Sequence, residues 1–364
     1  MRRLIMMGAG HAHLIVLKYW VAAPLKDVEV VLVTPSQWQY YSGMIPGWIA
    51  GHYSVEQCRI DAWSLAQKAG ARIVLNSVAE VRADQKQIRL ANGDLLDYDW
   101  LSIDVGAKTA LGSLRGYAGP LLSIKPFGQF QQHWSRHLDS SGARRAHLAL
   151  VGGGAAGAEL AMAAARAGRT GAALAARISL VTGSQGLLPD FHPRIRKLAY
   201  TKLAALGIQI FEQRAEAAGH DLVLTDGAIL RPDLVMAATG SEAFSFLATS
   251  GLAVDARGFV LVNEHQQSRS HPEVFAAGDV CSRSDQSLSR SGVHAVRAAP
   301  VLAENLRAAT ESGAFTAFQP RTHSLYLLSC GDKTAIGSYG PLAFSGRWVW
   351  RLKDKIDRRF VGGF

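Results

Sequence analysis

Cysteine is scarce in this sequence, which contains Cys58, Cys281 and Cys330 and no other cysteine among its 364 residues. The three stand far apart, and neither a C-x-x-C nor a C-x-x-x-x-C spacing occurs. A disulfide framework, a zinc knuckle and a local redox-active dithiol are therefore not supported, and no metal site is expected. This cysteine usage is typical of a reducing compartment, so we expect a cytoplasmic protein.

Long apolar runs are also missing. No stretch reaches the roughly 18 uninterrupted apolar residues that a membrane-spanning helix needs. Residues 1–20 have the charged start and apolar run of a signal peptide, but His11, His13 and Lys18 interrupt that run and a Gly-x-Gly lies inside it. The composition, 48% hydrophobic and 19% charged, predicts a well-filled globular protein, and the length predicts two or three domains.

A recognised nucleic-acid-binding module is absent too. The net charge is +10, but the basic residues are scattered through most of the chain. Attraction to anionic nucleotides or to anionic phospholipid explains this excess as well, so we expect no nucleic-acid partner.

One glycine motif is clear. Apolar residues 148–151 lead into Gly152-Gly153-Gly154-Ala155-Ala156-Gly157, and an Ala-rich segment of helical character follows. Gly152 permits a tight turn, Gly154 lets the backbone approach a pyrophosphate, and Gly157 lets the helix pack close to its strand. Because the helix N-terminus then faces the phosphates, a dinucleotide is expected to bind here.

A second strand, loop and helix open the chain. Residues 4–7 predict a short buried strand, Gly8-Ala9-Gly10 the turn, and residues 13–20 a helix. His13 stands at the third glycine position, which predicts a less intimate contact between helix and strand. Thr34 ends the next strand where an acid would normally hold a ribose, so only a hydroxyl of Thr34 or Ser36 is available for that contact.

Two such loops in one chain predict two nucleotide sites. The arrangement is typical of flavoproteins that take hydride from a nicotinamide cofactor. The second unit ends its second strand at Thr182, again without an acid, so the choice between NADH and NADPH stays open. Residues 40–51, aromatic and rich in glycine, predict a loop that packs either on a flavin or on the protein's own core.

Two further predicted strands end in glycine. Gly106 follows a buried strand near residue 103, and Gly278-Asp279 follows the apolar residues 274–277. Glycine at a strand end lets a ligand approach the backbone closely. A carboxylate at that position suits a polyol hydroxyl.

These motifs carry a resemblance over almost the whole chain. They occur in the order found in flavoproteins with two dinucleotide-binding domains, the pyridine nucleotide-disulfide oxidoreductase-like superfamily. Within it, the chain most resembles the branch of type II NADH dehydrogenases and sulfide:quinone oxidoreductases. Residues 10–13, 41–47 and 346–354 look closest to the flavoprotein module that is fused to some selenophosphate synthases.

The resemblance implies an α/β fold with two Rossmann-like domains, the second inserted in the first. The FAD-binding domain would comprise residues 1–118 and 252–315. The NAD(P)H-binding domain would span residues 119–251, and residues 316–364 would form a C-terminal cap or interface segment.

The resemblance also implies the residues that bind FAD. They would lie at the first glycine loop and at the strand ends around it: Gly8, Gly10, His11, Thr34, Gly106, Gly278 and Asp279. The two loop glycines would hold the pyrophosphate, and Asp279 would bind the ribityl chain.

For the nicotinamide cofactor, the resemblance implies binding by Gly152, Gly154 and Gly157. Glu159 would lie near the nicotinamide and act in catalysis. Lys125 would neighbour flavin N5, where a cation assists hydride arrival, although an ordinary solvated linker lysine is the alternative.

A basic amphipathic helix is predicted near the C-terminus. Its apolar residues, Trp348, Leu352, Ile356 and Phe360, follow i, i+4 spacing among several Arg and Lys residues. Such a helix suits the surface of a membrane, which would place the protein peripherally on the inner face of the cell membrane and favour a quinone as electron acceptor. The alternative is that Trp348 and Leu352 pack on the flavin domain or on a second subunit of a homodimer.

We therefore expect an FAD-dependent oxidoreductase that passes hydride from NAD(P)H to flavin and electrons on to a quinone or another small acceptor. Two alternatives stay open. One is oxidation of sulfide or selenide through Cys281 or Cys330. The other is a non-enzymatic flavin redox sensor, or a partner module in selenium metabolism.

Overall fold

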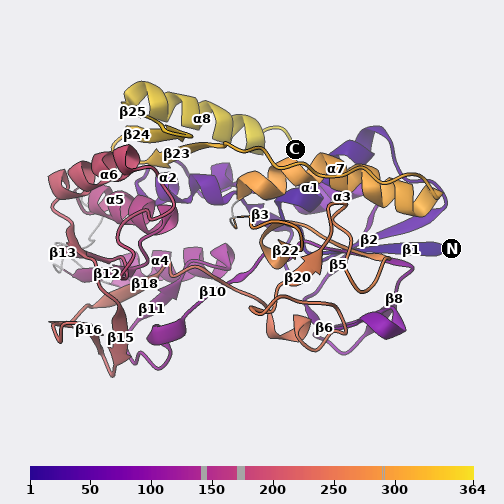
Figure 1. Ribbon diagram of the computed structural model, residues 1–364, viewed down its shortest axis with the longest axis horizontal. Coiled ribbons are helices and arrows are strands. Elements are labelled where there is room, and N and C mark those ends of the chain that lie inside the picture. Colours follow the sequence, from indigo (N-terminus) through magenta and orange to yellow (C-terminus); the bar gives the residue numbers. More distant parts are fainter. Residues whose placement is uncertain (141–145, 170–176, 289, 291) are drawn as a thin grey trace.

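The computed structural model describes residues 1–140, 146–169, 177–288, 290 and 292–364. Two five-stranded parallel sheets form its two halves (Figure 1). The first sheet has the order β21-β9-β1-β2-β5. Its strands are β1 (Arg2–Met7), β2 (Val28–Thr34), β5 (Arg72–Leu75), β9 (Trp100–Ile103) and β21 (Val274–Ala276).

Strand β1 explains why this sheet is covered on both faces. Alternate side chains of a strand point to opposite faces, and all four residues from Leu4 to Met7 are buried. Leu4 and Met6 pack with the helices of one face, whereas Ile5 and Met7 pack with a small antiparallel sheet on the other. The helices are α1 (His11–Ala22), α3 (Ala62–Lys68) and α7 (Gly292–Glu311), and the small sheet is β6 (Val78–Arg82), β7 (Gln87–Leu90) and β8 (Leu95–Asp97).

The second sheet repeats this design. Leu148 and Leu150 of its central strand pack with helices, and Ala149 and Val151 pack with a second antiparallel sheet. The order is β11-β18-β12-β13-β14. The strands are β11 (Leu121–Ser123), β12 (His147–Val151), β13 (Arg177–Val181), β14 (Gln209–Phe211) and β18 (Leu234–Ala237). The helices are α4 (Phe127–Ser140), α5 (Ala155–Arg169) and α6 (Pro193–Ala205). The antiparallel sheet consists of β15 (Ala215–Ala218), β16 (Asp221–Leu224) and β17 (Ile229–Leu230).

The chain crosses between the two halves on a short pair of strands. β10 (Lys108–Thr109) leaves the first half and pairs antiparallel with β19 (Ser241–Glu242), which returns to it. Two more short pairs, β3 (Trp38–Tyr40) with β4 (Arg59–Asp61) and β20 (Val260–Val262) with β22 (Cys281–Arg283), lie in the first half. The fold class is confirmed as mixed α/β with two Rossmann-like units, and the domain boundaries near residues 118 and 251 stay a prediction.

Residues 45–49 differ from the expected loop. They form the short helix α2 (Ile45–Ile49), which begins with proline in its first turn, where a missing N–H costs nothing. Trp48 of this helix packs edge-on against Phe127 and Phe130 of α4. An aromatic side chain of this segment therefore packs on the protein's own core.

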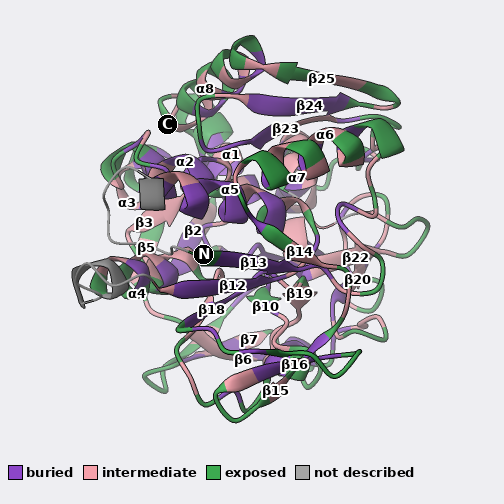
Figure 2. Cartoon of the chain, turned by 90° about the vertical axis from the view of Figure 1, so that its left-hand side faces the viewer, coloured by how far each residue is buried: buried purple, intermediate pink, exposed green. Residues whose placement is uncertain are grey.

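The C-terminal segment lies over the second half. β23 (Leu325–Ser329), β24 (Ala335–Tyr339) and β25 (Leu342–Gly346) form an antiparallel sheet that contacts α5 and α6 on one side and α8 (Arg347–Val361) on the other. Figure 2 shows buried β24 beneath an α8 with an exposed outer surface. None of the described helices is long and apolar enough to cross a membrane.

Candidate functional site: two dinucleotide loops

Gly8 shows why the first loop needs glycine. Its φ is +92°, and a Cβ added there would lie 2.5 Å from the carbonyl oxygen of Asp104. The Gly8 N–H donates to the carbonyl of Val33 at 2.8 Å, and the Gly10 N–H donates to that of Asp104 at 3.2 Å. The loop is therefore fixed against the ends of β2 and β9 and leads directly into α1.

His13 fills the place of the third glycine. Its imidazole is fully buried, with Nδ1 2.6 Å from the Gly8 carbonyl oxygen and Nε2 2.7 Å from Ser102 Oγ. Burial lowers the pKa of His13 to about 4, so the ring is neutral at pH 7. The imidazole of His13 thus fills the space that the wider contact between helix and strand was expected to leave, and its hydrogen bonds join the loop to β9.

Asp104 is a residue of this site to which sequence reasoning gave no role. It follows β9, is 3% exposed, and accepts a 2.9 Å hydrogen bond from the N–H of His13 in the first turn of α1. Burial raises the pKa of Asp104 to about 7, although the N–H groups of His13 and Ala12 oppose that shift. The available signal was an acidic residue ending a buried strand, where a neutral residue is expected.

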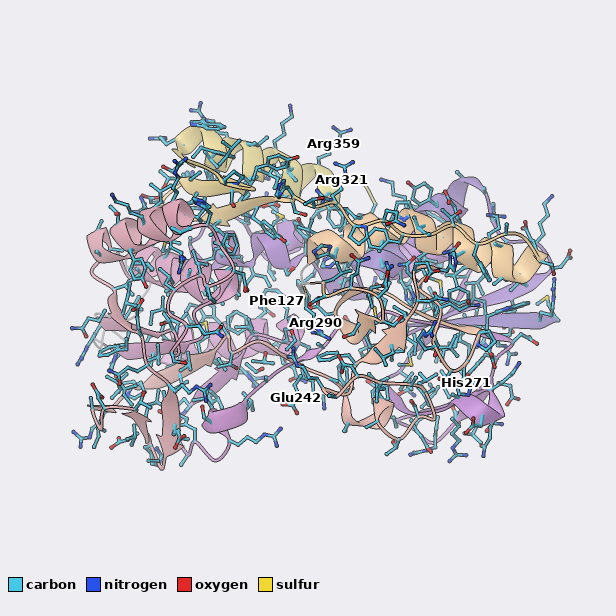
Figure 3. The ribbon with its side chains drawn as sticks, in the orientation of Figure 1. Phe127, Glu242, His271, Arg290, Arg321 and Arg359 are labelled. Atoms are coloured by element: carbon cyan, nitrogen blue, oxygen red, sulfur yellow. The ribbon has the colours of Figure 1, made fainter. Side chains whose placement is uncertain are left out.

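Lys125 and Asp279 meet although they are far apart in sequence. The Lys125 Nζ lies 2.6 Å from Asp279 Oδ2. Asp279 follows Gly278 at the end of β21, and Lys125 lies between β11 and α4. Figure 3 places Phe127, two residues after Lys125, between the two halves of the molecule. The fold thus forms an ion pair between Lys125, the predicted catalytic cation, and Asp279, a predicted FAD-binding residue.

His11, Thr34 and Gly106 complete the predicted FAD residues. Burial lowers the pKa of His11 to about 4, and its buried Nε2 has no hydrogen-bond partner among the described residues. The Thr34 hydroxyl donates to the Ser36 carbonyl at 3.2 Å. Gly106 has a φ of +69°, and a Cβ there would meet no atom within 4 Å. An orphaned imidazole nitrogen and open space beside a left-handed glycine fit a bound cofactor.

The second loop separates glycines needed for the fold from one that faces open space. A Cβ at Gly152, whose φ is +137°, would lie 2.1 Å from the Ala238 carbonyl oxygen, and one at Gly157 would lie 1.9 Å from that of Gly152. A Cβ at Gly154 would meet nothing within 4 Å. Since α5 begins at the next residue, the space beside Gly154 adjoins a helix N-terminus and fits the phosphates of a dinucleotide.

Glu159 lies at a junction with the C-terminal segment. Its Oε1 accepts a 2.7 Å hydrogen bond from the N–H of Ser329, the last residue of β23. Burial raises the pKa of Glu159 to about 7, and the positive charge of Lys353 opposes the shift. A carboxyl group that titrates near neutral pH suits proton transfer. Its place beside the nicotinamide stays a prediction.

Helix α8 corrects one expectation. Lys353 is not part of a surface charge pattern, because its side chain is only 9% exposed. Its Nζ donates to Asp357 Oδ2 and to the Gly43 carbonyl, both at 2.7 Å. Trp348 and Ile356, in contrast, are 57% and 41% exposed, and the indole of Trp348 stacks on Phe344 of β25. Leu352 is partly buried, and its packing on the flavin domain or on a second subunit stays a prediction.

The cysteines form no disulfide, and all three are free. Burial raises the pKa of both Cys281 and Cys330 to about 12. Cys281 Sγ lies 3.5 Å from the carbonyl oxygens of Ala276 and Gly278, to which the thiol donates. Neither thiol is therefore poised as a thiolate nucleophile.

Comparison with known proteins places these features in a family. The family model for pyridine nucleotide-disulphide oxidoreductases matches residues 2–299. The ferredoxin–NAD(+) reductase component of a biphenyl dioxygenase system from Paraburkholderia xenovorans is 30% identical over 211 residues, covering 54% of this chain and 47% of that protein. A type II NADH:quinone oxidoreductase from Haemophilus influenzae is 24% identical over 327 residues, covering 75% of this chain and 73% of that protein.

A solved structure shares the fold. NDH2 from Plasmodium falciparum in complex with NADH aligns with a TM-score of 0.79 and 16% identity, covering 98% of this chain and 97% of that one. The chain spans about half the length, or less, of the first curated relatives that it matches, the ferredoxin–NAD(+) reductase component among them. The predicted superfamily is confirmed, and its members use FAD and NAD(P)H. Because the family model covers most of its length, this chain belongs to the pyridine nucleotide-disulphide oxidoreductase family.

Proposed function

We propose that the protein is an FAD-dependent NAD(P)H:acceptor oxidoreductase whose acceptor is a quinone. The observation that carries this proposal is the presence of two loops, at Gly8–Gly10 and at Gly152–Gly154, that each join a buried strand to a helix N-terminus. When bound, FAD would supply the redox chemistry, taking hydride from the nicotinamide and passing electrons to the acceptor.

The residues of the chain would bind and orient the two nucleotides. Gly8 and Gly10 would hold the pyrophosphate of FAD, Asp279 its ribityl chain, and Gly106 would leave room beside it. Gly154 would admit the phosphates of NAD(P)H next to α5. Most of the catalytic effect would come from this alignment, since positioning alone lowers barriers substantially.

Lys125 would place a positive charge where negative charge develops during flavin reduction. Its Nζ lies 2.6 Å from Asp279 Oδ2, so the side chain is held at the predicted ribityl site. Removing one preorganised charge of this kind costs on the order of 100-fold in rate. Stopped-flow reduction by NADH and NADPH should therefore be slower by about that factor in Lys125→Met, whereas Lys68→Met, an exposed control on α3, should reduce at the wild-type rate.

Glu159 would exchange a proton near the nicotinamide, in keeping with a pKa raised to about 7 by burial. A Glu159→Gln variant should lose the pH dependence of turnover near neutrality. Flavin reduction and turnover that both match the wild type across pH 6–8 would remove this role.

The choice of quinone is supported by exposed side chains of the C-terminal segment. Four large apolar residues are exposed there: Tyr339 (48%), Leu342 (57%), Trp348 (57%) and Ile356 (41%). The exposed cations of α8 are Arg347, Arg351, Lys355, Arg358 and Arg359. Aromatic and aliphatic side chains flanked by cations suit the interface of an anionic membrane, where quinones dissolve.

Two experiments test the acceptor. Turnover with a water-soluble ubiquinone analogue should exceed turnover with a ferredoxin. Sedimentation with anionic phosphatidylglycerol vesicles should be lost in Trp348→Ser/Ile356→Ser and kept in Leu75→Ser/Leu95→Ser, which removes two exposed apolar residues of the first half. Equal sedimentation of both variants would contradict the membrane assignment.

Oxidation of sulfide or selenide through Cys281 or Cys330 has less support, because both thiols are buried and have raised pKa values. A redox sensor without turnover is distinguished from the proposed enzyme by steady-state assay. Tight FAD binding with flavin reduction too slow for turnover would favour the sensor.

A further inference from the structure

The carboxyl group of Asp104 lies at the N-terminus of α1, inside the predicted FAD site. One oxygen accepts the N–H of His13 at 2.9 Å, and the N–H of Ala12 also donates to the carboxyl group. The backbone of Asp104 is fixed as well, because its N–H donates to the Met7 carbonyl at 2.9 Å. The side chain thus takes up N–H groups that a helix N-terminus otherwise offers to a bound anion.

Gly10 and Gly278 leave the room that this carboxyl group occupies. A Cβ added at Gly10 would lie 2.3–2.4 Å from the Asp104 carboxyl atoms, and one at Gly278 would lie 2.8 Å from Oδ1. Asp104 is 3% exposed. A side chain enclosed in this way cannot swing aside when a ligand arrives without rearranging the loop.

No cation faces Asp104 closely enough to form an ion pair in the described part of the chain. The titratable groups around it are His11 and His13 on α1, Asp279 after β21, and the Cys281 thiol of β22. Burial keeps both imidazoles neutral at pH 7. The ammonium group of Lys125 pairs with Asp279.

A dinucleotide bound at the Gly8–Gly10 loop brings its pyrophosphate to the same helix N-terminus. An ionised Asp104 would then place a carboxylate against phosphate in a buried site, and like charges that share such a site do not both stay ionised. A protonated carboxyl group, in contrast, can still accept from the helix and can donate its own O–H to a phosphate oxygen.

We propose that Asp104 carries a proton when FAD is bound near neutral pH, so that FAD binding is coupled to proton uptake and weakens as the pH rises. This inference rests on the proposed FAD site and makes Asp104 a positioning residue for the cofactor.

The direction of the pH effect follows from proton linkage. Burial raises the pKa of Asp104 to about 7 without ligand, and the pyrophosphate would raise it further. Below pH 7 the group is already neutral in both states, so the affinity for FAD changes little. Above pH 7 binding requires proton uptake, and the Kd for FAD should rise by about tenfold per pH unit until the pKa of the bound state is reached.

The test uses the purified holoprotein. Diluting it into buffers at pH 6, 7, 8 and 9 and measuring the fluorescence of released FAD gives the Kd at each pH. Asp104→Asn keeps the shape of the side chain without a charge, and Asp99→Asn removes an exposed carboxylate just before the same strand. The wild type and Asp99→Asn should show the rise above pH 7, and Asp104→Asn should show a nearly constant Kd.

A second measurement does not depend on any variant. A pH indicator in weakly buffered solution at pH 8 should report the release of about one proton for each FAD released by the wild type. A constant Kd in the wild type without proton release, or an unchanged slope in Asp104→Asn, would overturn the inference. A protein that binds no FAD at any of these pH values would instead contradict the proposed function.

Discussion

Gly154 lies in the loop before α5 and Gly157 in the first turn of that helix, and the structure predicts opposite consequences for adding a methyl group to each. At Gly157 the new Cβ would lie 1.9 Å from the Gly152 carbonyl oxygen. Helix α5 or the loop must move to relieve that contact, and overpacking of this kind costs about 1–3 kcal/mol of stability. At Gly154 the new Cβ would meet nothing within 4 Å, so Gly154→Ala should change stability by no more than about 0.5 kcal/mol.

Nucleotide binding, unlike stability, should be sensitive to a substitution at Gly154. The methyl group would occupy the space through which a phosphate approaches the N–H groups of α5. Loss of one hydrogen bond to a charged group costs about 1.5–3 kcal/mol, which corresponds to about a 10- to 150-fold rise in Kd. Gly154→Ala should therefore bind the nicotinamide nucleotide weakly while remaining as stable as the wild type.

Two assays separate these effects. Urea denaturation followed by tryptophan fluorescence measures the free energy of unfolding, and quenching by NAD⁺ and NADP⁺ measures the Kd without reducing the flavin. The reasoning is refuted if Gly154→Ala binds both nucleotides as the wild type does. It is also refuted if the alanine at 154 destabilises the protein as much as the alanine at 157.

Three further predictions follow from buried side chains. Burial raises the pKa of Glu159 to about 7, so the native state keeps a proton that the unfolded state releases above about pH 4.5. The free energy of unfolding should therefore fall between pH 5 and 7, and Glu159→Gln should reduce this pH dependence in urea denaturation. Lys353→Met leaves a buried carboxylate without its cation and should cost about 3–5 kcal/mol, against at most about 0.5 kcal/mol for the exposed Lys355→Met; equal losses would argue against the buried pair. Cys281→Ser and Cys330→Ser should both keep wild-type NAD(P)H turnover, and abolished activity in either would revive the sulfide alternative.

Local patterns in the sequence predicted the two dinucleotide units well. In each unit a buried strand, a glycine loop and a helix are consecutive, and the alternation along the strand is set by its own backbone. The steric need for Gly157 was predictable for the same reason, since the carbonyl it approaches belongs to Gly152 of the same motif. Gly152 instead approaches the carbonyl of Ala238, which follows β18, so its close contact joins distant residues.

The contacts that assemble the site were not predictable in this way, because they join distant residues. Lys125 reaches Asp279, Glu159 reaches Ser329, and Asp104 reaches His13. Each pairing depends on how the sheets and the C-terminal segment are placed. The sequence contained an acid at position 104 but no indication that its carboxyl group would cap α1.

The C-terminal helix shows how a charge pattern can mislead. Lys353 resembles its exposed basic neighbours in sequence, but Asp357 one turn later and the Gly43 carbonyl satisfy its ammonium group in a buried position. The i, i+4 spacing of opposite charges was the available signal. For residues 45–49 the signal was a proline, which suits the first turn of a helix as well as a loop.

The most direct test of the proposed function is an absorption spectrum of the purified protein during anaerobic titration with NADH and then NADPH. The account predicts flavin bands that bleach rapidly with at least one of the two nucleotides and return when a quinone is added. Flavin bands that persist with both nucleotides, or a protein without flavin that takes up none, would contradict it.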